Sequence, residues 1–250
     1  MKTFRFIGMA LFAVLMCVNF VACSSSDDEP NINREEDGNI KKKLMRLELE
    51  GTDVSNKFVY EFSYDNDNRL IQVISNGNKY YFNWIDDKIH AAIRENTSIY
   101  DLSNGLITKI VFENNLYTWG LSFNQSKELT EYTIQQRNET SLYKWEDNNI
   151  VAFGKEGNEF TSIEYSNKIN KGWWYPECEL IDMSYYMDEN AFLFIAHPNL
   201  LGKQCAYLPK KFKGEHNYDF IFNVDKDGYV EKCTIVKANG QTRVYTYTWE

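Results

Sequence analysis

Apolar and polar residues alternate along most of the chain from residue 57 onward. In the run 58–64 an aromatic residue occupies every second position, and in the last strand-like run Tyr245, Tyr247 and Trp249 share one parity. A period of two places successive side chains on opposite faces of a β-strand. These runs therefore predict strands that bury one face.

Clusters of Asn, Asp, Ser and Gly interrupt the alternating runs. The main clusters are centred on residues 66, 87, 104, 125, 148, 167 and 226, and further clusters of the same composition lie between them. Asn-Gly and Asp-Gly tolerate the positive φ that tight hairpin turns demand. The sequence therefore predicts an all-β fold, a long antiparallel hairpin meander of about fourteen to sixteen strands. A sheet that wide with one apolar face must close into a barrel or curve over itself as two layers.

The turn spacing fails between residues 170 and 217, where three of the four prolines lie. The segment Ser184–Ala196 is rich in apolar residues without clear alternation, which favours a short helix or 3-10 turns ahead of Pro198. We expect an irregular or helical insertion here, with 184–209 packed as a plug on the apolar face of the sheet.

Three consecutive aromatic residues, Trp173, Trp174 and Tyr175, open this insertion. They have two interpretations, a hydrophobic part of the plug or an exposed platform on which sugar rings stack. At most two of the three can share one surface if the segment is extended.

Cys23 follows a basic start with Lys2 and Arg5, an apolar run over 6–22 and the small residue Ala22. A polar, acidic stretch comes after it. This pattern is typical of a lipoprotein signal peptide, so Cys23 is the predicted lipidation site and mature N-terminus. The alternative is a transmembrane helix, but a run of about 17 apolar residues is at the lower limit for spanning a bilayer.

The chain is thereby divided into three predicted parts: a signal peptide over 1–22, a lipidated tether over 23–40 and an all-β hairpin-repeat domain over 41–250. The expected location is the outer membrane, with the domain exposed at the cell surface or facing the periplasm. Without residues 1–22, 25 basic and 36 acidic residues remain, a net charge of −11. An acidic surface repels nucleic acid, which is therefore not an expected partner.

Few residues point to chemistry. Three cysteines besides Cys17 and Cys23 leave open a Cys178–Cys205 disulfide or simply buried thiols, and the three histidines show no ligand spacing, so no metal or cofactor is expected. The segment 223–228 begins like a calcium loop, but Thr234 replaces the glutamate that such a loop needs. A hairpin turn is the favoured interpretation. No nucleophile or phosphate-binding motif occurs, and no carboxylate pair is singled out, so the sequence leans against an enzyme.

The turn chemistry, the acidic tether and the pattern from Leu200 to Val230 resemble a large set of uncharacterised Bacteroidetes lipoproteins with a domain of unknown function. The resemblance covers most of 40–250 and implies a porin-like β fold. It brings no catalytic residues.

The sequence thus favours a binding or scaffolding module at the outer membrane, held by its lipid and open to a glycan or an envelope protein. A glycan-active hydrolase is one alternative, and an outer-membrane pore is the other. A mean hydropathy of −0.52 and short strands speak against lipid-facing walls.

Overall fold

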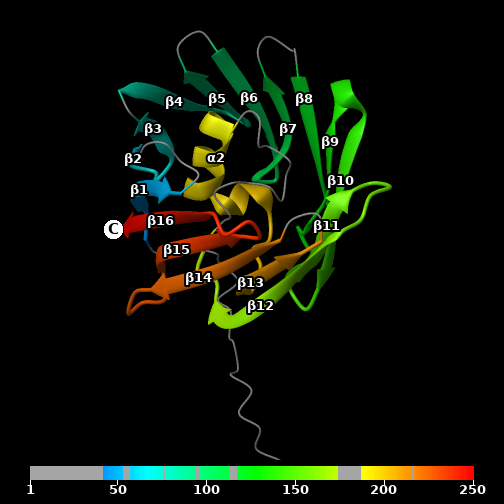
Figure 1. Ribbon diagram of the computed structural model, residues 1–250. Coiled ribbons are helices and arrows are strands. Elements are labelled where there is room, and N and C mark those ends of the chain that lie inside the picture. Colours follow the sequence, from blue (N-terminus) through cyan, green and yellow to red (C-terminus); the bar gives the residue numbers. More distant parts are fainter. Residues whose placement is uncertain are drawn as a thin grey trace, which may run out of the picture. The chain divides into compact units, whose positions relative to one another are not determined.

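Sixteen antiparallel strands form one closed barrel in the part of the chain that the computed structural model describes, residues 42–52, 57–75, 77–93, 96–112, 117–173, 187–214 and 217–250. Each strand pairs with the next one in sequence, and β1 pairs with β16 to close the ring (Figure 1). The predicted all-β antiparallel meander with a short helical insertion is confirmed, and of the two expected arrangements the sheet adopts the closed barrel. The strands are β1 (Leu44–Gly51), β2 (Phe58–Tyr64), β3 (Leu70–Ser75), β4 (Asn78–Ile85), β5 (Lys88–Ile93), β6 (Asn96–Ser103), β7 (Leu106–Phe112), β8 (Tyr117–Phe123), β9 (Leu129–Ile134), β10 (Glu139–Glu146), β11 (Asn149–Lys155), β12 (Thr161–Ile169), β13 (Tyr207–Lys213), β14 (Tyr218–Val224), β15 (Val230–Lys237) and β16 (Thr242–Trp249).

The insertion holds the helix α2 (Met187–Ala196) and the 3-10 turn η4 (Pro198–Leu201), while a second 3-10 turn, η2 (Gln135–Arg137), joins β9 to β10. None of the described helices is both long and apolar enough to cross a membrane. Two details differ from expectation. The cluster at Ser166–Asn167 is not a turn, because β12 runs through it, and β13 lies inside the range 170–217 that lacked a strand signal. Its Pro209 and consecutive lysines hide the alternation from the sequence.

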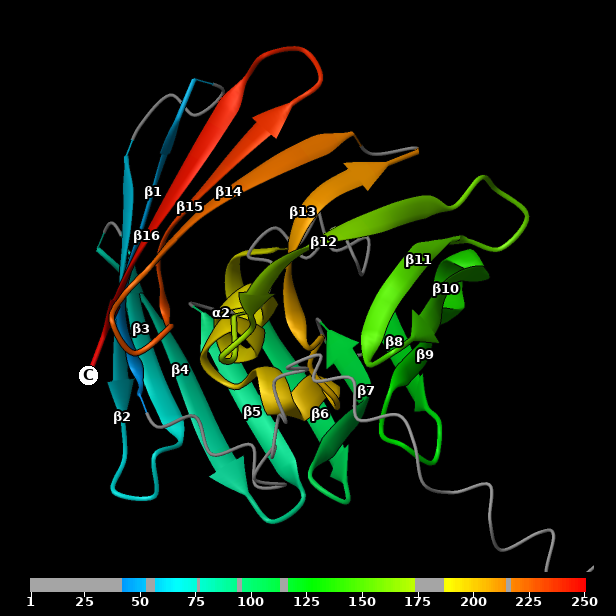
Figure 2. The ribbon, with the colours of Figure 1, turned by 90° about the horizontal axis from the view of Figure 1, so that it is seen from below.

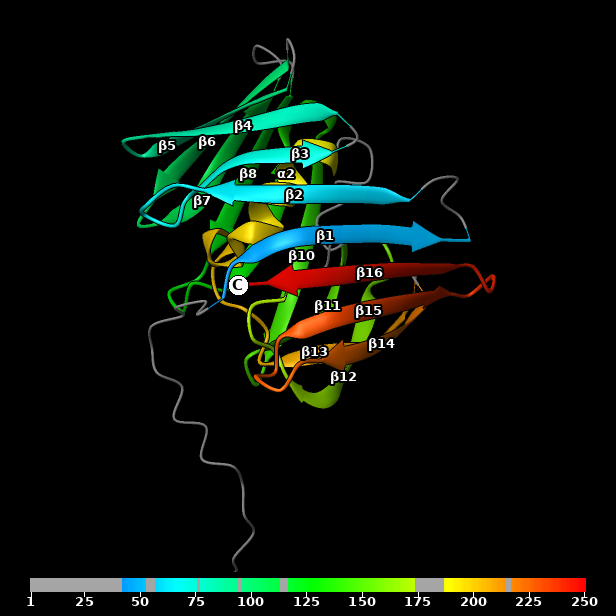
Figure 3. The ribbon, with the colours of Figure 1, turned by 90° about the vertical axis from the view of Figure 1, so that its left-hand side faces the viewer.

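The core of the barrel consists of the inward side chains of the strands. In β4 the buried Tyr80 and Phe82 alternate with the exposed Tyr81 and Asn83, and the other strands repeat this parity. Strands β1 and β16 lie side by side (Figure 3), and their ladder is extended by Lys43 and Glu250, which bond each other's backbone. The ring therefore leaves no free sheet edge at its closure.

One end of the barrel is built from a repeated device. All even-numbered strands end there. Six of them have a register shift beside their last inward residue: β2, β6, β8, β10, β12 and β14. We therefore call this end the bulged rim. At five strand ends this last residue is a Tyr or Trp that donates a hydrogen bond to a backbone carbonyl at the start of the preceding strand: Tyr64 to Leu44, Trp84 to Leu70, Trp145 to Leu129, Tyr165 to Ile150 and Trp249 to Val230. A bulge re-aims a side chain, which accounts for the turn of Tyr64, Trp145 and Tyr165 toward the preceding strand. Trp84 makes the same contact from a regular register.

Three turns at this rim share one hydrogen-bond pattern. Asp65, Asn124 and Asp225 each accept, through a side-chain oxygen, the backbone N–H groups two and four residues later. The fourth residue of each turn has positive φ, being Asn68, Lys127 or Gly228. The Asn and Asp clusters of the sequence therefore form side-chain-capped turns, as their composition predicts.

The outer face of the barrel is polar with scattered apolar residues. Ion pairs join neighbouring strands, including Lys88 with Asp101 at 2.8 Å and Lys211 with Asp219 at 3.2 Å, and Arg46 pairs with Glu48 at 2.7 Å on β1. Large apolar side chains with more than a third of their surface exposed occur on β3, β4, β12 and β14: Ile71, Tyr81, Ile85, Ile169 and Ile221. A lipid-facing barrel carries a continuous apolar band about 25 Å tall. Charged pairs interrupt any such band here.

Candidate functional site

The helix α2 lies inside the ring of strands, and with η4 it forms what we call the plug (Figure 2). All side chains from Ala191 to Ala196 are buried, as are Leu200 and Leu201. Phe192 packs against Tyr60 and Tyr80, with ring centroids 4.9 and 5.0 Å apart. The plug therefore joins the hydrophobic core of the barrel wall through the apolar second half of α2, Ala191–Ala196.

The exit of the plug is fastened to the bulged rim. The Lys203 N–H donates to the Lys127 carbonyl at 2.8 Å, and the Lys203 ammonium pairs with Glu128 at 2.8 Å. Further along, Ala206 N–H donates to the Asn148 carbonyl at 3.0 Å. Gly202 has φ +84°, and a Cβ there would lie 2.2 Å from the Lys127 carbonyl oxygen. Only glycine allows this close approach.

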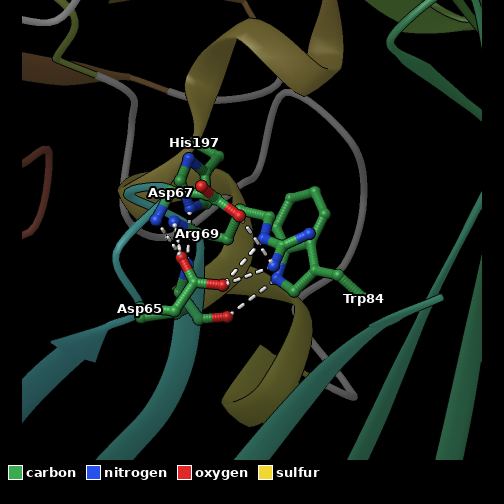
Figure 4. A network of polar contacts seen from close by, with 6 residues as sticks. Asp65, Asp67, Arg69, Trp84 and His197 are labelled. Atoms are coloured by element: carbon green, nitrogen blue, oxygen red, sulfur yellow. Dashed lines mark hydrogen bonds and ion pairs between the residues drawn. The ribbon is translucent and has the colours of Figure 1, made fainter. Parts of the chain in front are cut away.

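His197 fastens the other part of the plug, between α2 and η4 (Figure 4). Its Nε2 accepts a hydrogen bond from the backbone N–H of Leu70 at 2.9 Å. The Leu70 carbonyl accepts in turn from the Trp84 indole at 2.9 Å. The imidazole packs edge-on against the rings of Trp84 and Tyr64, with centroids 5.4 and 6.0 Å apart. Because Nε2 is the acceptor, we assign the neutral tautomer with its proton on Nδ1.

Burial lowers the pKa of His197 to about 4, and the nearby Asp65 carboxylate opposes the shift only in part. Asp65 is itself engaged by Arg69, with both Nε and a terminal nitrogen 2.7 Å from Oδ2. A backbone hydrogen bond from Arg69 is the largest cause that holds the pKa of Asp65 below its ordinary value. Arg69 also reaches Asp67, at 3.1 Å. The imidazole is therefore neutral at pH 7 and acts as a hydrogen-bond acceptor.

The predicted site residues fall in different places. Trp173 is 5% exposed, and its indole donates to the Tyr247 hydroxyl at 2.8 Å while its ring meets Phe222 edge-on. It belongs to the core, as the hydrophobic interpretation of this segment expects. Trp174 and Tyr175 lie outside the described residues, and so does Cys23. The aromatic platform and the lipidation site therefore stay predictions.

The calcium-like segment is a hairpin turn. The Lys42 ammonium lies 2.7 Å from both Asp225 and Asp227 and 5.0 Å from the centre of the Tyr229 ring. A cation of the chain itself thus occupies the position between the two carboxylates. No group of three or more His, Cys, Asp or Glu in the described ranges is placed to hold a metal ion.

Groups suited to covalent or acid–base chemistry are sparse. Cys205 is half-buried and Cys233 is buried, and Cys178 lies outside the described residues, so the Cys178–Cys205 disulfide stays a prediction. The Cys205 sulfur accepts a hydrogen bond from the Tyr165 hydroxyl at 3.3 Å. The buried polar residues of the described ranges are Ser, Thr and Asn, with no Asp or Glu among them. The described interior therefore offers no carboxylate pair of the kind that glycoside hydrolysis uses.

Sequence reasoning missed the role of His197. The spacing of the three histidines bears only on metal binding, and it matches no metal-ligand pattern. The available signal was local: His197 comes directly after an apolar helix and before Pro198, which places a polar ring where the helix must end.

Comparison with known proteins adds evidence on the fold. No family model matches the chain, and none of the curated proteins matches its sequence. Among solved structures, a porin-like protein from Bacteroides uniformis superposes with a TM-score of 0.66 over 83% of this chain and 98% of that one. The two sequences are 15% identical, so the similarity is one of fold alone. The chain therefore has a porin-like barrel fold, as the sequence resemblance implied.

Proposed function

We propose that this chain is a lipid-anchored barrel of the cell envelope that binds a glycan or an envelope protein and does not conduct solutes. The observation that carries this proposal is the plug. Six consecutive buried residues of α2, from Ala191 to Ala196, pack with the inward side chains of the wall in one hydrophobic core. A conducting barrel needs a polar, water-filled interior.

The outer face supports an attachment by lipid instead of by the barrel wall. Charged residues such as Arg46, Glu48 and Glu61 stand together on the outside of β1 and β2. Exposed charges of this kind oppose burial in a bilayer by about 2–4 kcal/mol each for basic residues at the midplane. A lipid on Cys23 and a polar tether over 24–40 would hold such a barrel at the membrane surface.

Two matched variants test the anchor. Cys23→Ala should abolish labelling by radioactive palmitate and move the protein from the detergent phase to the aqueous phase. Cys17→Ala is the control and should leave both properties unchanged. Unlabelled wild-type protein in the aqueous phase would contradict the anchor.

Ligand binding is tested on Trp174 and Tyr175, which follow Trp173 in the sequence. Because Trp173 is buried and bonded to Tyr247, its replacement would disturb folding and binding together. The double variant Trp174→Ala, Tyr175→Ala is the sharper probe on a glycan array, with thermal melting measured in parallel. Loss of glycan retention with unchanged melting supports the platform. Equal retention by variant and wild type places the binding surface elsewhere, and turnover of a glycan would favour the hydrolase alternative.

An outer-membrane pore is the second candidate, and the fold similarity to the porin-like protein favours it. Reconstitution of the full chain in planar bilayers separates the two functions. The proposed function predicts no stepwise conductance, with a known porin as the positive control. Discrete conductance steps from the wild-type chain would establish the pore and overturn the proposal.

A further inference from the structure

Two contacts of different chemistry attach the plug to the barrel, one after η4 at the exit of the plug and one at the C-terminal end of α2. At its exit, the Lys203 ammonium pairs with Glu128, and the Lys203 N–H bonds the Lys127 carbonyl. The pKa of Glu128 is lowered, chiefly by the hydrogen bond from Lys203, so this pair stays ionised in mild acid. At the α2 end, the described polar contact with the barrel wall is the bond from Leu70 N–H to His197 Nε2.

The His197 contact requires a neutral imidazole. Protonation places a hydrogen on Nε2, which then faces the Leu70 N–H across 2.9 Å as a second donor. Neither group has an acceptor in that arrangement, so the ring must leave its position. The His197 backbone continues α2, with its N–H bonded to the Leu193 carbonyl, and its carbonyl accepts from Leu200 in η4. Loss of the Leu70 bond therefore removes a polar tie to the barrel wall at the point where α2 and η4 meet.

Among the described residues, the carboxylate that acts on His197 is Asp65, and it is already paired with Arg69. The β2–β3 turn presents Asp65 and Asp67, both engaged by Arg69. From β2 and β4 come the rings of Tyr64 and Trp84, whose polar atoms donate to backbone carbonyls. On its own segment, Pro198 and Gln204 carry no charge, and the charged Lys203 is paired with Glu128. Arg69 adds positive charge beside Asp65, which opposes protonation further.

We propose that protonation of His197 releases the α2 end of the plug from the barrel wall, while the Lys203 end stays attached. The plug is then an acid-sensitive latch that opens the interior of the barrel. This release changes access to the interior of the barrel, whatever ligand the outer surface binds.

Linkage sets the size of the effect. The pKa of His197 is lowered to about 4 in the latched form, while a released, solvated histidine has about 6.5. Below pH 6.5 the released form takes up the proton first, so acid favours release. The opening equilibrium should rise about 30-fold between pH 8 and pH 5.

Hydrogen exchange on the full chain measures this opening. Protection factors of the α2–η4 amides, corrected for the intrinsic pH dependence of exchange, should fall about 30-fold from pH 8 to pH 5, while those of β8–β10 stay constant. His197→Gln, which retains an acceptor at a similar reach and cannot be protonated, should remove the pH dependence. The matched control His90→Gln, on the outer face of β5, should keep it.

Three outcomes would overturn the latch: constant α2 protection in the wild type, an equal fall in His197→Gln, or loss of the fall in His90→Gln. If His197→Gln does not fold, an NMR titration of the imidazoles in the wild-type chain still decides. A His197 midpoint near 4 with α2 opening between pH 6.5 and 4 supports the proposal. A midpoint near 6.5 without loss of α2 protection refutes it.

Discussion

The ammonium of Lys42 lies 2.7 Å from the carboxylate of Asp225, although 183 residues separate them in the chain. The contact ties the start of the barrel to the turn between β14 and β15, two strands away from the point where the ring closes. The hydrogen bond from Lys42 is the largest cause that holds the pKa of Asp225 below its ordinary value, and the same interaction raises the pKa of Lys42. The lysine thus joins the residues just before β1 to the β14–β15 turn.

Replacing Lys42 should weaken this tie. We expect Lys42→Met to lower the melting temperature in dilute buffer and the difference to shrink in 1 M salt, because salt screens exposed charges. Lys226→Met, in the same turn, is the control and should change melting less. Equal effects of the two substitutions at both salt concentrations would show that the Lys42 pair adds nothing specific.

The aromatic donors of the bulged rim should contribute individually to stability. Tyr64→Phe removes only the hydroxyl that bonds the Leu44 carbonyl, so we expect a loss of about 0.5–1.5 kcal/mol in the free energy of unfolding. Tyr81→Phe is the matched control, since Tyr81 points outward with 49% of its surface exposed. Urea denaturation measures both. Equal values for the pair would mean that the rim bond is energetically neutral.

The plug should behave as part of the core. Phe194 is fully buried, with its ring edge-on to Tyr100, so Phe194→Ala should lower the free energy of unfolding by about 3–5 kcal/mol. Ile221→Ala, at a position 57% exposed on β14, should change it by less than about 0.5 kcal/mol. A Phe194→Ala variant with wild-type denaturation would mean that the plug is not packed in solution.

Gly240 and Gly202 both have positive φ, but only Gly202 lies against another part of the backbone. Gly240→Ala meets no atom within 4 Å, so only its φ of +82° opposes the substitution, at about 1 kcal/mol. Gly202→Ala meets a backbone with φ +84° and ψ −146°, a region essentially restricted to glycine, and also brings Cβ against the Lys127 carbonyl. We expect it to destabilise the protein clearly more than Gly240→Ala, as measured by thermal melting. Similar melting of the two variants would contradict the tight attachment of the plug exit.

His197→Phe keeps an aromatic ring but loses the acceptor for Leu70 N–H. At pH 7.5 we expect a loss of about 1–3 kcal/mol, the range for a buried donor left without a partner. The folded pKa of His197 lies below its unfolded value, so the wild-type contribution is complete above pH 6.5 and declines as the pH falls toward 4. The difference between variant and wild type should therefore shrink at pH 4.5. A difference that stays constant with pH would mean that protonation of His197 is not coupled to folding.

The sequence by itself determined the strands, because a period of two and Asn/Asp-rich turns are local properties of the chain. Runs such as 58–64 and 80–84 can be recognised as strands without knowledge of their partners, and their number predicts a sheet too wide to stay open. The apolar segment 184–196 similarly predicted a helical plug. The strand β13 escaped detection, because Pro209 and Lys210–Lys211 break its alternation and only pairing with β12 and β14 makes it a strand.

Tertiary structure alone decided which contacts hold the plug in the interior. The Leu70 N–H and His197 Nε2 are 127 residues apart, and no pattern in the chain pairs them. The same holds for Trp173, whose place in the core depends on Tyr247 from the last strand. Local residues set the period and the turns, whereas closure of the ring and burial of polar partners depend on distances that only the folded chain creates.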